Sequence, residues 1–206
     1  MHTEITHPLV KHRLAVLRDK ETGMKLFRET IGELARFLVY EAMRGAPTTI
    51  AAVETPLATA QCELLKGETV LVPILRAGLG MLDAAAAILP DAAVGFLGMY
   101  RDHATAQPVE YYANIPPARD DSTAVVLDPM LATGGSAAAG IAFLKSRGFK
   151  KIIFVCVLSS AEGVARIEAE HPDVPVFTAA IDAEMNASKY IVPGLGDAGD
   201  RIFGTI

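Results

Sequence analysis

One stretch of the chain decides the fold: Val125-Val126-Leu127-Asp128-Pro129-Met130-Leu131-Ala132-Thr133-Gly134-Gly135-Ser136, which leads into an alanine-rich segment that Gly148 ends. The β-branched run at its start predicts a buried strand, and the alanine-rich segment predicts a helix. A polar loop with paired glycines joins the two. A strand, a glycine loop and a helix in this order are typical of an α/β unit.

Further apolar runs alternate with helical patterns along the chain. The runs span residues 69–75, 94–99, 152–158 and 174–181, and helical patterns follow the first of them, to Ala87, and the third, over residues 161–169. Continuous apolar runs are expected where both faces of a strand are covered. The sequence therefore predicts one α/β domain over residues 1–206, with a parallel twisted sheet flanked by helices.

The N-terminal part is predicted to be helical. Residues 10–17 form a short helical arm, and residues 24–43 form a longer helix. The longer helix has an apolar stripe at helical spacing: Phe27, Ile31, Leu34 and Leu38. Such a helix can close the core of its own chain or pack on a second subunit, and the sequence leaves both alternatives open.

Composition and charge narrow the class of protein. The net charge of −5 argues against a nucleic-acid-binding protein, which needs a basic face. No apolar run approaches the ~20 residues that span a bilayer, and residues 1–12 lack the apolar core of a signal peptide. We therefore expect a cytoplasmic protein with neither a nucleic-acid nor a membrane partner. The two cysteines are too few for a disulfide framework or a metal cluster, and Cys156 is expected to be buried.

The glycine loop has the properties of a phosphate-binding site. Gly134 and Gly135 lack a Cβ, so a ligand can approach the backbone closely. The unpaired amides at the start of the next helix lie at the positive end of its dipole, and the hydroxyls of Thr133 and Ser136 add donors. Asp128, at the end of the strand, can accept hydrogen bonds from sugar hydroxyls. The alternative is an ordinary strand-to-helix turn that Ser136 caps.

Two arginines also follow apolar runs. Arg76 comes directly after residues 69–75, and Arg101 comes shortly after residues 94–99. Ligands bind at the carboxyl ends of parallel strands, so both guanidinium groups are expected near the glycine loop. There they could neutralise a pyrophosphate, whose oxygens suit the planar fork of arginine. Each could instead be a solvated surface arginine.

Two later segments are rich in turn-forming residues. Residues 107–114 alternate apolar and polar side chains, which indicates a hairpin projecting from the sheet. Residues 190–201 contain three glycines and a proline, a composition that excludes a regular helix and predicts a structured loop. An ordinary surface hairpin and a turn-rich tail are the alternatives for these two segments.

These motifs resemble those of the uracil phosphoribosyltransferases, a branch of the type I phosphoribosyltransferases. Residues 126–136 are similar to the motif that binds 5-phosphoribosyl 1-diphosphate (PRPP), and residues 73–81 and 99–102 are similar to the pyrophosphate segments. Type I enzymes in general begin the PRPP motif with two adjacent acidic residues. Here Asp128 is followed by Pro129, which is typical of the uracil branch. The resemblance runs from about Arg13 onward, and residues 190–201 resemble the uracil-recognition loop.

The resemblance implies a role for individual residues. It implies PRPP contacts at Arg76, Arg101, Asp128, Pro129, Met130, Leu131, Ala132, Thr133, Gly134, Gly135, Ser136 and Asp197. It implies uracil contacts at Ile191, Gly196, Asp197 and Ala198, whose backbone groups would match the uracil edge and exclude cytosine. Arg76 and Arg101 would stabilise the leaving pyrophosphate, and Asp197 would help uracil to lose its N1 proton.

The resemblance also implies an activity and its partners. The expected reaction joins uracil to PRPP and gives UMP and pyrophosphate, a step of pyrimidine salvage. Mg²⁺ would be bound mainly through PRPP, without a metal site made by the protein alone. The resemblance further implies a GTP effector and a homodimer or larger homo-oligomer. It also implies that residues 107–114 form a mobile flap over the active site.

Three rival functions use the same fold. The first is an RNA-binding attenuator of pyrimidine genes, which would need a basic face that the net charge of −5 does not favour. The second is a phosphoribosyltransferase for another base, such as orotate or hypoxanthine. The third is a nucleotide-binding α/β protein without catalytic activity.

Overall fold

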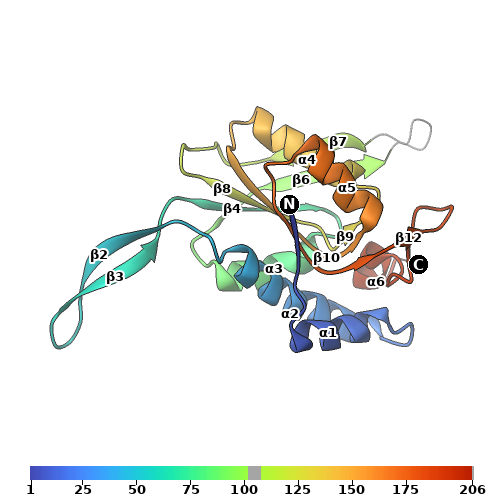
Figure 1. Cartoon of the computed structure of the whole chain (residues 1–206), viewed down its shortest axis with the longest axis horizontal. Helices are drawn as coiled ribbons and strands as arrows, with labels where there is room; N and C mark the ends of the chain where they lie inside the picture. Colours follow the sequence, from blue (N-terminus) through green and yellow to red (C-terminus); the bar gives the residue numbers. More distant parts are fainter. Residues whose placement is uncertain (102–107, 206) are drawn as a thin grey trace.

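The computed structural model describes residues 1–101 and 108–205, apart from the side chains of Tyr100, Arg101 and Pro108. A central sheet has the strand order β1-β11-β10-β8-β4-β6-β7, and helices cover both of its faces (Figure 1). Neighbouring strands run parallel, except for β6 and β7, which are antiparallel. The predicted parallel sheet flanked by helices is therefore confirmed.

The bounds of the elements follow the predicted runs closely. The strands of the sheet are β1 (His2–Glu4), β4 (Thr69–Leu75), β6 (Phe96–Arg101), β7 (Pro108–Asn114), β8 (Thr123–Leu127), β10 (Lys151–Ser160) and β11 (Val176–Asp182), with β5 (Ala93–Val94) beside β4 and β9 (Met130–Leu131) beside β10. The helices are α1 (Pro8–Arg18), α2 (Met24–Ala42), α3 (Leu79–Ile88), α4 (Gly135–Ser146), α5 (Ala161–Glu170) and α6 (Ala198–Phe203). The predicted run 174–181 begins before β11 because Pro175 has no amide hydrogen for strand pairing.

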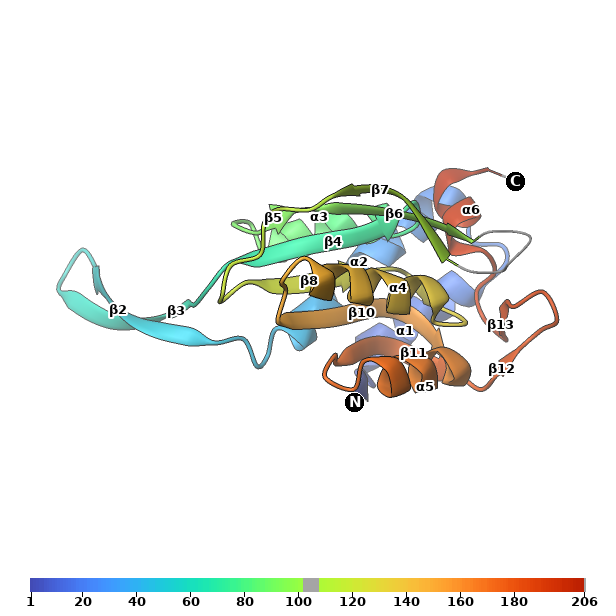
Figure 2. The ribbon, with the colours of Figure 1, turned by 90° about the horizontal axis from the view of Figure 1, so that it is seen from above.

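The central strands are buried on both faces, as their apolar runs predict. All five residues of β8 are buried. Val125 and Leu127 pack in one core cluster with α1, α2, α3 and α6, whereas Ala124 and Val126 pack in a second cluster with α4 and α5. Figure 2 shows the sheet between these two layers. Cys156 lies in the second cluster, and burial raises the pKa of its thiol to about 12.

The apolar stripe of α2 closes the core of its own chain. Phe27, Ile31, Leu34 and Leu38 have no exposed surface. The long N-terminal helix therefore packs on the sheet of its own chain, which is the first of the two alternatives that the sequence left open. Each such buried side chain contributes about 1.5–3 kcal/mol through the hydrophobic effect.

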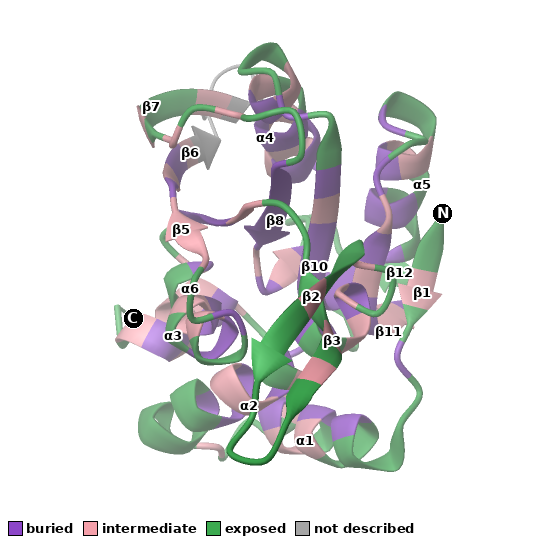
Figure 3. Cartoon of the chain, turned by 90° about the vertical axis from the view of Figure 1, so that its left-hand side faces the viewer, coloured by how far each residue is buried: buried purple, intermediate pink, exposed green. Residues whose placement is uncertain are grey.

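Two hairpins are attached to the sheet in different ways. β7 pairs with β6 along its length, so residues 108–114 form one edge strand of the sheet. The prediction of a hairpin that projects from the sheet is therefore wrong for these residues, and Gln107 lies outside the described residues. The second hairpin, β2 (Thr48–Glu54) with β3 (Thr59–Leu65), was not predicted. Its strands pair only with each other, and Figures 1 and 3 show that it projects away from the sheet and is mostly exposed.

Candidate active site

A cavity of about 670 Å³ lies at the carboxyl ends of β4 and β8. It is lined by Arg76, Ala77, Asp128, Met130, Ala132, Thr133, Ser188, Lys189, Tyr190, Ile191, Gly196, Asp197, Ala198 and Gly199. Three segments that the sequence singled out separately therefore meet in one place. The parallel sheet explains the meeting, because consecutive parallel strands present the loops after them at the same edge.

Asp128 begins the loop after β8 and is held by the backbone. Its amide donates to the Val155 carbonyl at 3.2 Å, and its Oδ1 accepts a hydrogen bond from the Met130 amide at 3.4 Å. Burial raises the pKa of the Asp128 carboxyl to about 7, although the bond from Met130 opposes the shift. The group therefore changes charge near neutral pH, and a polar ligand or cation in the cavity would favour its ionised form.

The glycine turn leaves the start of α4 without a side-chain cap. Gly134 is the N-cap residue, with φ of 73°, and supplies no side-chain cap, while the Gly135 amide donates to Thr133 Oγ1 at 3.5 Å. Ser136 lies inside the helix, so the alternative in which Ser136 is the cap is wrong. A Cβ on Gly134 would lie 3.1 Å from the Gly163 carbonyl oxygen, and the positive φ also favours glycine.

The side chains of the PRPP-like segment divide between the cavity and the core. Met130, Ala132 and Thr133 line the cavity. Pro129 and Leu131 are buried, and the Pro129 carbonyl accepts from the amides of Val157 and Leu158. A ligand in the cavity therefore cannot contact the side chains of Pro129 or Leu131. The turn and first helical residues, 134–136, follow at the start of α4 and are not part of the cavity lining.

Arg76 projects into the cavity from the end of β4. Its side chain is 60% exposed, and its Nη2 lies 3.9 Å from Asp200 Oδ1 in α6. Gly78 allows this tight turn, because a Cβ there would lie 2.3 Å from the Leu127 carbonyl oxygen. Arg101 is the last residue of β6, and its side chain lies outside the described part of the chain.

The C-terminal loop, residues 190–197, forms the opposite wall of the cavity. Ile191 is buried in β13 (Ile191–Val192), which pairs with β12 (Glu184–Met185). Gly196, Asp197 and Ala198 line the cavity with it. The four predicted uracil contacts therefore face one space together with Arg76 and Asp128.

The prediction that residues 190–201 exclude a regular helix is wrong at its end. The short helix α6 begins at Ala198, directly after Asp197. Asp197 Oδ1 accepts a hydrogen bond from the Asp200 amide at 2.9 Å, which caps the helix, and Ile202 is buried in the core. Capping and burial therefore offset the low helix propensity of Gly199.

Several residues of the site were not singled out from the sequence. Ser188 and Lys189 line the cavity but carry no motif. Arg166 of α5 lies beside the glycine turn, because a Cβ on Gly135 would lie 3.3 Å from its Nη1. Arg166 also pairs with Glu170 at 2.8 Å. Its position depends on the packing of α5 beside α4, for which the local sequence gives no signal.

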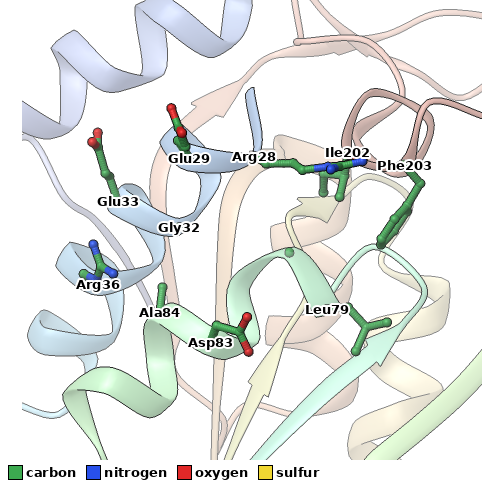
Figure 4. A pocket seen from close by; sticks show the side chains of 11 residues that line it. Arg28, Glu29, Gly32, Glu33, Arg36, Leu79, Asp83, Ala84, Ile202 and Phe203 are labelled. Atoms are coloured by element: carbon green, nitrogen blue, oxygen red, sulfur yellow. The ribbon is translucent and has the colours of Figure 1, made fainter. Parts of the chain in front are cut away.

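A second cavity, of about 720 Å³, lies between α2, α3 and α6 (Figure 4). Arg28 and Arg36 line it together with carboxylates, and Phe203 and Leu79 supply apolar surface. Arg28 uses its Nε to donate to the Ile202 carbonyl. This cavity shares α6 with the first one, since Asp197 and Ala198 lie at the start of that helix and Phe203 at its end.

The described residues hold no group of three or more His, Cys, Asp or Glu side chains that could bind a metal ion. In residues 1–101 and 108–205, no helix is both long and apolar enough to cross a membrane. The carboxylates of Asp128 and Asp197 in the first cavity are hard oxygen donors, which suit a Mg²⁺ ion that is otherwise held by substrate phosphates and water.

A protein-family model described as uracil phosphoribosyltransferase matches residues 4–205 of the chain. The chain belongs to the uracil phosphoribosyltransferase family. A uracil phosphoribosyltransferase of Clostridium perfringens is 51% identical over 204 residues, covering 98% of each chain. One of Natranaerobius thermophilus is 51% identical over 202 residues, covering 98% of this chain and 97% of the relative. The chain is thus similar to its relatives over nearly their full length.

Solved structures with a similar fold are also found. The AQ2163 protein from Aquifex aeolicus superposes with a TM-score of 0.95 at 37% identity, covering 100% of this chain and 99% of that one. An adenine phosphoribosyltransferase from Trypanosoma brucei has a TM-score of 0.55 at 13% identity, covering 87% of this chain and 83% of the other. The second comparison shows the shared fold alone.

Proposed function

We propose that the chain transfers the 5-phosphoribosyl group of PRPP to N1 of uracil, giving UMP and pyrophosphate, with residues 1–206 acting as one phosphoribosyltransferase domain. The observation that carries the proposal is the cavity in which Arg76, Asp128, Ile191 and residues 196–198 face one another. Family membership over residues 4–205 supports the same activity.

The donor would be anchored at the start of α4. The amides of residues 133–136 and the Thr133 hydroxyl would bind the 5′-phosphate, and the helix dipole would favour its negative charge. Asp128 would accept hydrogen bonds from the ribose hydroxyls when it is ionised. Backbone groups of this loop, rather than the side chains of Pro129 and Leu131, would complete the PRPP contacts.

Catalysis would depend on positioning and on charge. As pyrophosphate leaves the anomeric carbon, positive charge develops on the ribose ring and negative charge on the leaving group. Arg76 and Arg101 would stabilise the leaving pyrophosphate. When bound, Mg²⁺ supplies further positive charge there, and Asp128 and Asp197 are the carboxylates of the cavity that could contribute to its coordination.

The base would bind against the C-terminal loop. Backbone groups of Ile191, Gly196 and Ala198 would match the donors and acceptors of uracil and oppose the exocyclic amine of cytosine. Asp197 would accept the N1 proton, directly or through water. One carboxylate oxygen of Asp197 caps α6, and the other oxygen remains for this role.

The exposed β2–β3 hairpin is the observation that supports a homo-oligomer. Directly opposed residues of β2 and β3 share a face, so Thr49, Ala51, Val53, Ala60, Cys62 and Leu64 form one continuous, mostly apolar face. Leu64 is 47% exposed, and Leu57 at the tip is 97% exposed. An isolated hairpin is marginally stable in water, so we propose that a second copy of the chain covers this face.

For the GTP effector, we propose the cavity between α2, α3 and α6. Arg28 and Arg36 suit phosphate oxygens, Phe203 offers a ring for stacking, and the carboxylates can accept from guanine donors. Its shared helix α6 would couple the effector to Asp197. If this holds, GTP activates the wild type and Arg36→Ala loses the activation while keeping the rate without GTP. An unchanged response in that variant would contradict the assignment.

Steady-state assays test the proposed function directly. UMP formation from uracil and PRPP, dependent on Mg²⁺, is expected, with cytosine, orotate and hypoxanthine much poorer acceptors. A better rate with another base would favour the second rival function, and no pyrophosphate release at all would favour a binding protein. RNA binding at nanomolar protein concentration that weakens with added salt would favour the first rival function, an RNA-binding attenuator. A cytoplasmic location stays a prediction, which cell fractionation tests.

A further inference from the structure

The C-terminal loop is held by side chains that do not line the cavity. Arg18, the last residue of α1, makes a two-pronged ion pair with Asp182, the last residue of β11, with both N–O distances at 2.7 Å. The same guanidinium donates to the Gly194 carbonyl at 2.9 Å. The Gly194 amide in turn donates to Asp182 Oδ2 at 2.9 Å. Both backbone groups of Gly194 are therefore fixed by one ion pair.

A second arginine fixes the next residue of the loop. Nη1 of Arg201, in α6, donates to the carbonyls of Leu195 and Leu17 at 2.7 and 2.6 Å. Its Nη2 donates to the carbonyls of Asp19 and Thr22. The guanidinium also lies over the Phe27 ring, 4.2 Å from its centroid. Arg201 therefore ties the loop to the connection between α1 and α2.

The contacts between Arg18, Asp182 and Gly194 are largely buried and specific in geometry. The side chain of Asp182 is 9% exposed and that of Arg18 is 26% exposed. Burial opposes ionisation of Asp182, but the hydrogen bonds from Arg18 and Gly194 outweigh it and lower the pKa of Asp182. Gly194 has φ of 64°, and a Cβ there would lie 2.1 Å from the Ile191 carbonyl oxygen. The backbone at Gly194 therefore has little freedom to adjust.

We propose that Arg18, Asp182 and Arg201 are positioning residues that hold the C-terminal loop in the geometry that admits uracil. None of them lines the cavity. They fix Gly194 and Leu195, which lie between the proposed uracil contacts Ile191 and Gly196. The inference rests on the proposed function, because it takes these backbone groups as the surface that reads the base.

Uracil binding and PRPP binding should respond differently to a loosened loop. In Arg18→Lys a single ammonium cannot reproduce the two-pronged pair and the third bond to Gly194. We expect the KM for uracil to rise about 10-fold or more while the KM for PRPP stays within about two-fold. Asp182→Asn and Arg201→Lys should show the same split. The ratio of cytosine to uracil kcat/KM should rise in all three variants.

Two control variants separate this role from general damage. Arg44→Lys alters an exposed two-pronged pair with Glu41, and Asp173→Asn alters a 2.6 Å pair with Lys145, both away from the cavity. Both should keep the wild-type KM values. Thermal melts establish that each variant is folded at the assay temperature.

The outcomes distinguish a failure of the positioning role from a failure of the proposed function. If all three folded variants keep the wild-type KM for uracil, or if the KM for PRPP rises equally, the positioning role is wrong although the enzyme is a uracil phosphoribosyltransferase. If the wild type forms no UMP, the proposed function itself has failed. Arg18→Lys and Arg201→Lys both keep the positive charge, so they are the conservative variants of the set.

Discussion

Nη2 of Arg76 lies 3.9 Å from Oδ1 of Asp200, so the loop after β4 and the helix after the C-terminal loop meet across the cavity. The pair is loose and exposed, and such pairs contribute about 0–1 kcal/mol to stability. Arg76 is therefore available to a ligand. A pyrophosphate arriving in the cavity would compete with Asp200 for the guanidinium.

Arg76→Ala should reduce catalysis rather than stability. Removing one electrostatic donor to the leaving group costs about 2–4 kcal/mol of transition-state stabilisation, which is roughly a 30- to 900-fold loss in kcat/KM. Arg119→Ala, which removes an exposed arginine 3.8 Å from Glu68, is the matched control and should keep the wild-type rate. Wild-type kinetics in Arg76→Ala would place the pyrophosphate elsewhere.

Asp128→Asn should change both activity and the pH dependence of stability. The raised pKa of Asp128, about 7 against an ordinary 3.8, means that the folded state holds this proton more tightly than the unfolded state. The contribution of the group to the free energy of unfolding therefore falls as the pH rises from about 4 to about 7. Above pH 7 the variant should melt at a higher temperature than the wild type.

The same variant should lose activity, because it cannot offer a carboxylate to the ribose hydroxyls. Hydrogen bonds to charged groups contribute about 1.5–3 kcal/mol, so we expect kcat/KM to fall roughly 10- to 150-fold at pH 8. Melting curves from pH 4 to 9 and initial rates at pH 8 check the two effects. An Asp128→Asn protein with wild-type kcat/KM would remove Asp128 from the site.

Asp197→Asn separates proton transfer from helix capping. Asparagine caps a helix as well as aspartate does, so the melting temperature should change little. Loss of the proton acceptor should lower kcat by about 10²–10⁴-fold. Asp197→Ala should in addition lose about 0.5–2 kcal/mol of stability with the cap. The role fails if kcat/KM for Asp197→Asn equals that of the wild type at every pH from 6 to 9.

Leu64→Lys should weaken the proposed assembly. Leu64 lies on the apolar face of the β2–β3 hairpin, and a buried lysine there would be unpaired. Gln61→Lys, in the same strand but on the opposite face, is the matched control. Sedimentation at micromolar protein should find the wild type and Gln61→Lys as oligomers and Leu64→Lys shifted toward monomer. A monomeric wild type would contradict the assignment of this face.

The sheet and the cavity could be predicted because their signals are local. Buried runs such as 123–127 and 69–75 are continuous in the sequence. The turn at Gly134 can be recognised from the adjacent residues Thr133, Gly135 and Ser136. Since strand ends in a parallel sheet share one edge, Arg76 and Asp128 could be placed together without a structure. The burial of Pro129 and Leu131 could not be predicted locally, because it depends on β10: Leu131 pairs with Ser159 and lies in the core, and the Pro129 carbonyl accepts from the amides of Val157 and Leu158.

The missed features leave little signal in the local sequence. Arg18 and Asp182 are 164 residues apart, and neither stands in a motif. Residues 48–54 and 59–65 pair with each other in a hairpin that projects away from the sheet, so the pattern of the central sheet gives no signal for them. Helix α6 depends on the Asp197 cap and on burial of Ile202 more than on its own propensity.

A crystal structure of the chain with UMP bound tests the central claim most directly. We predict that the 5′-phosphate accepts hydrogen bonds, at about 2.7–3.2 Å, from the amides of residues 133–136, with the uracil ring against residues 191–198. A phosphate bound at a distance from the start of α4, for example between α2 and α3, would contradict the account.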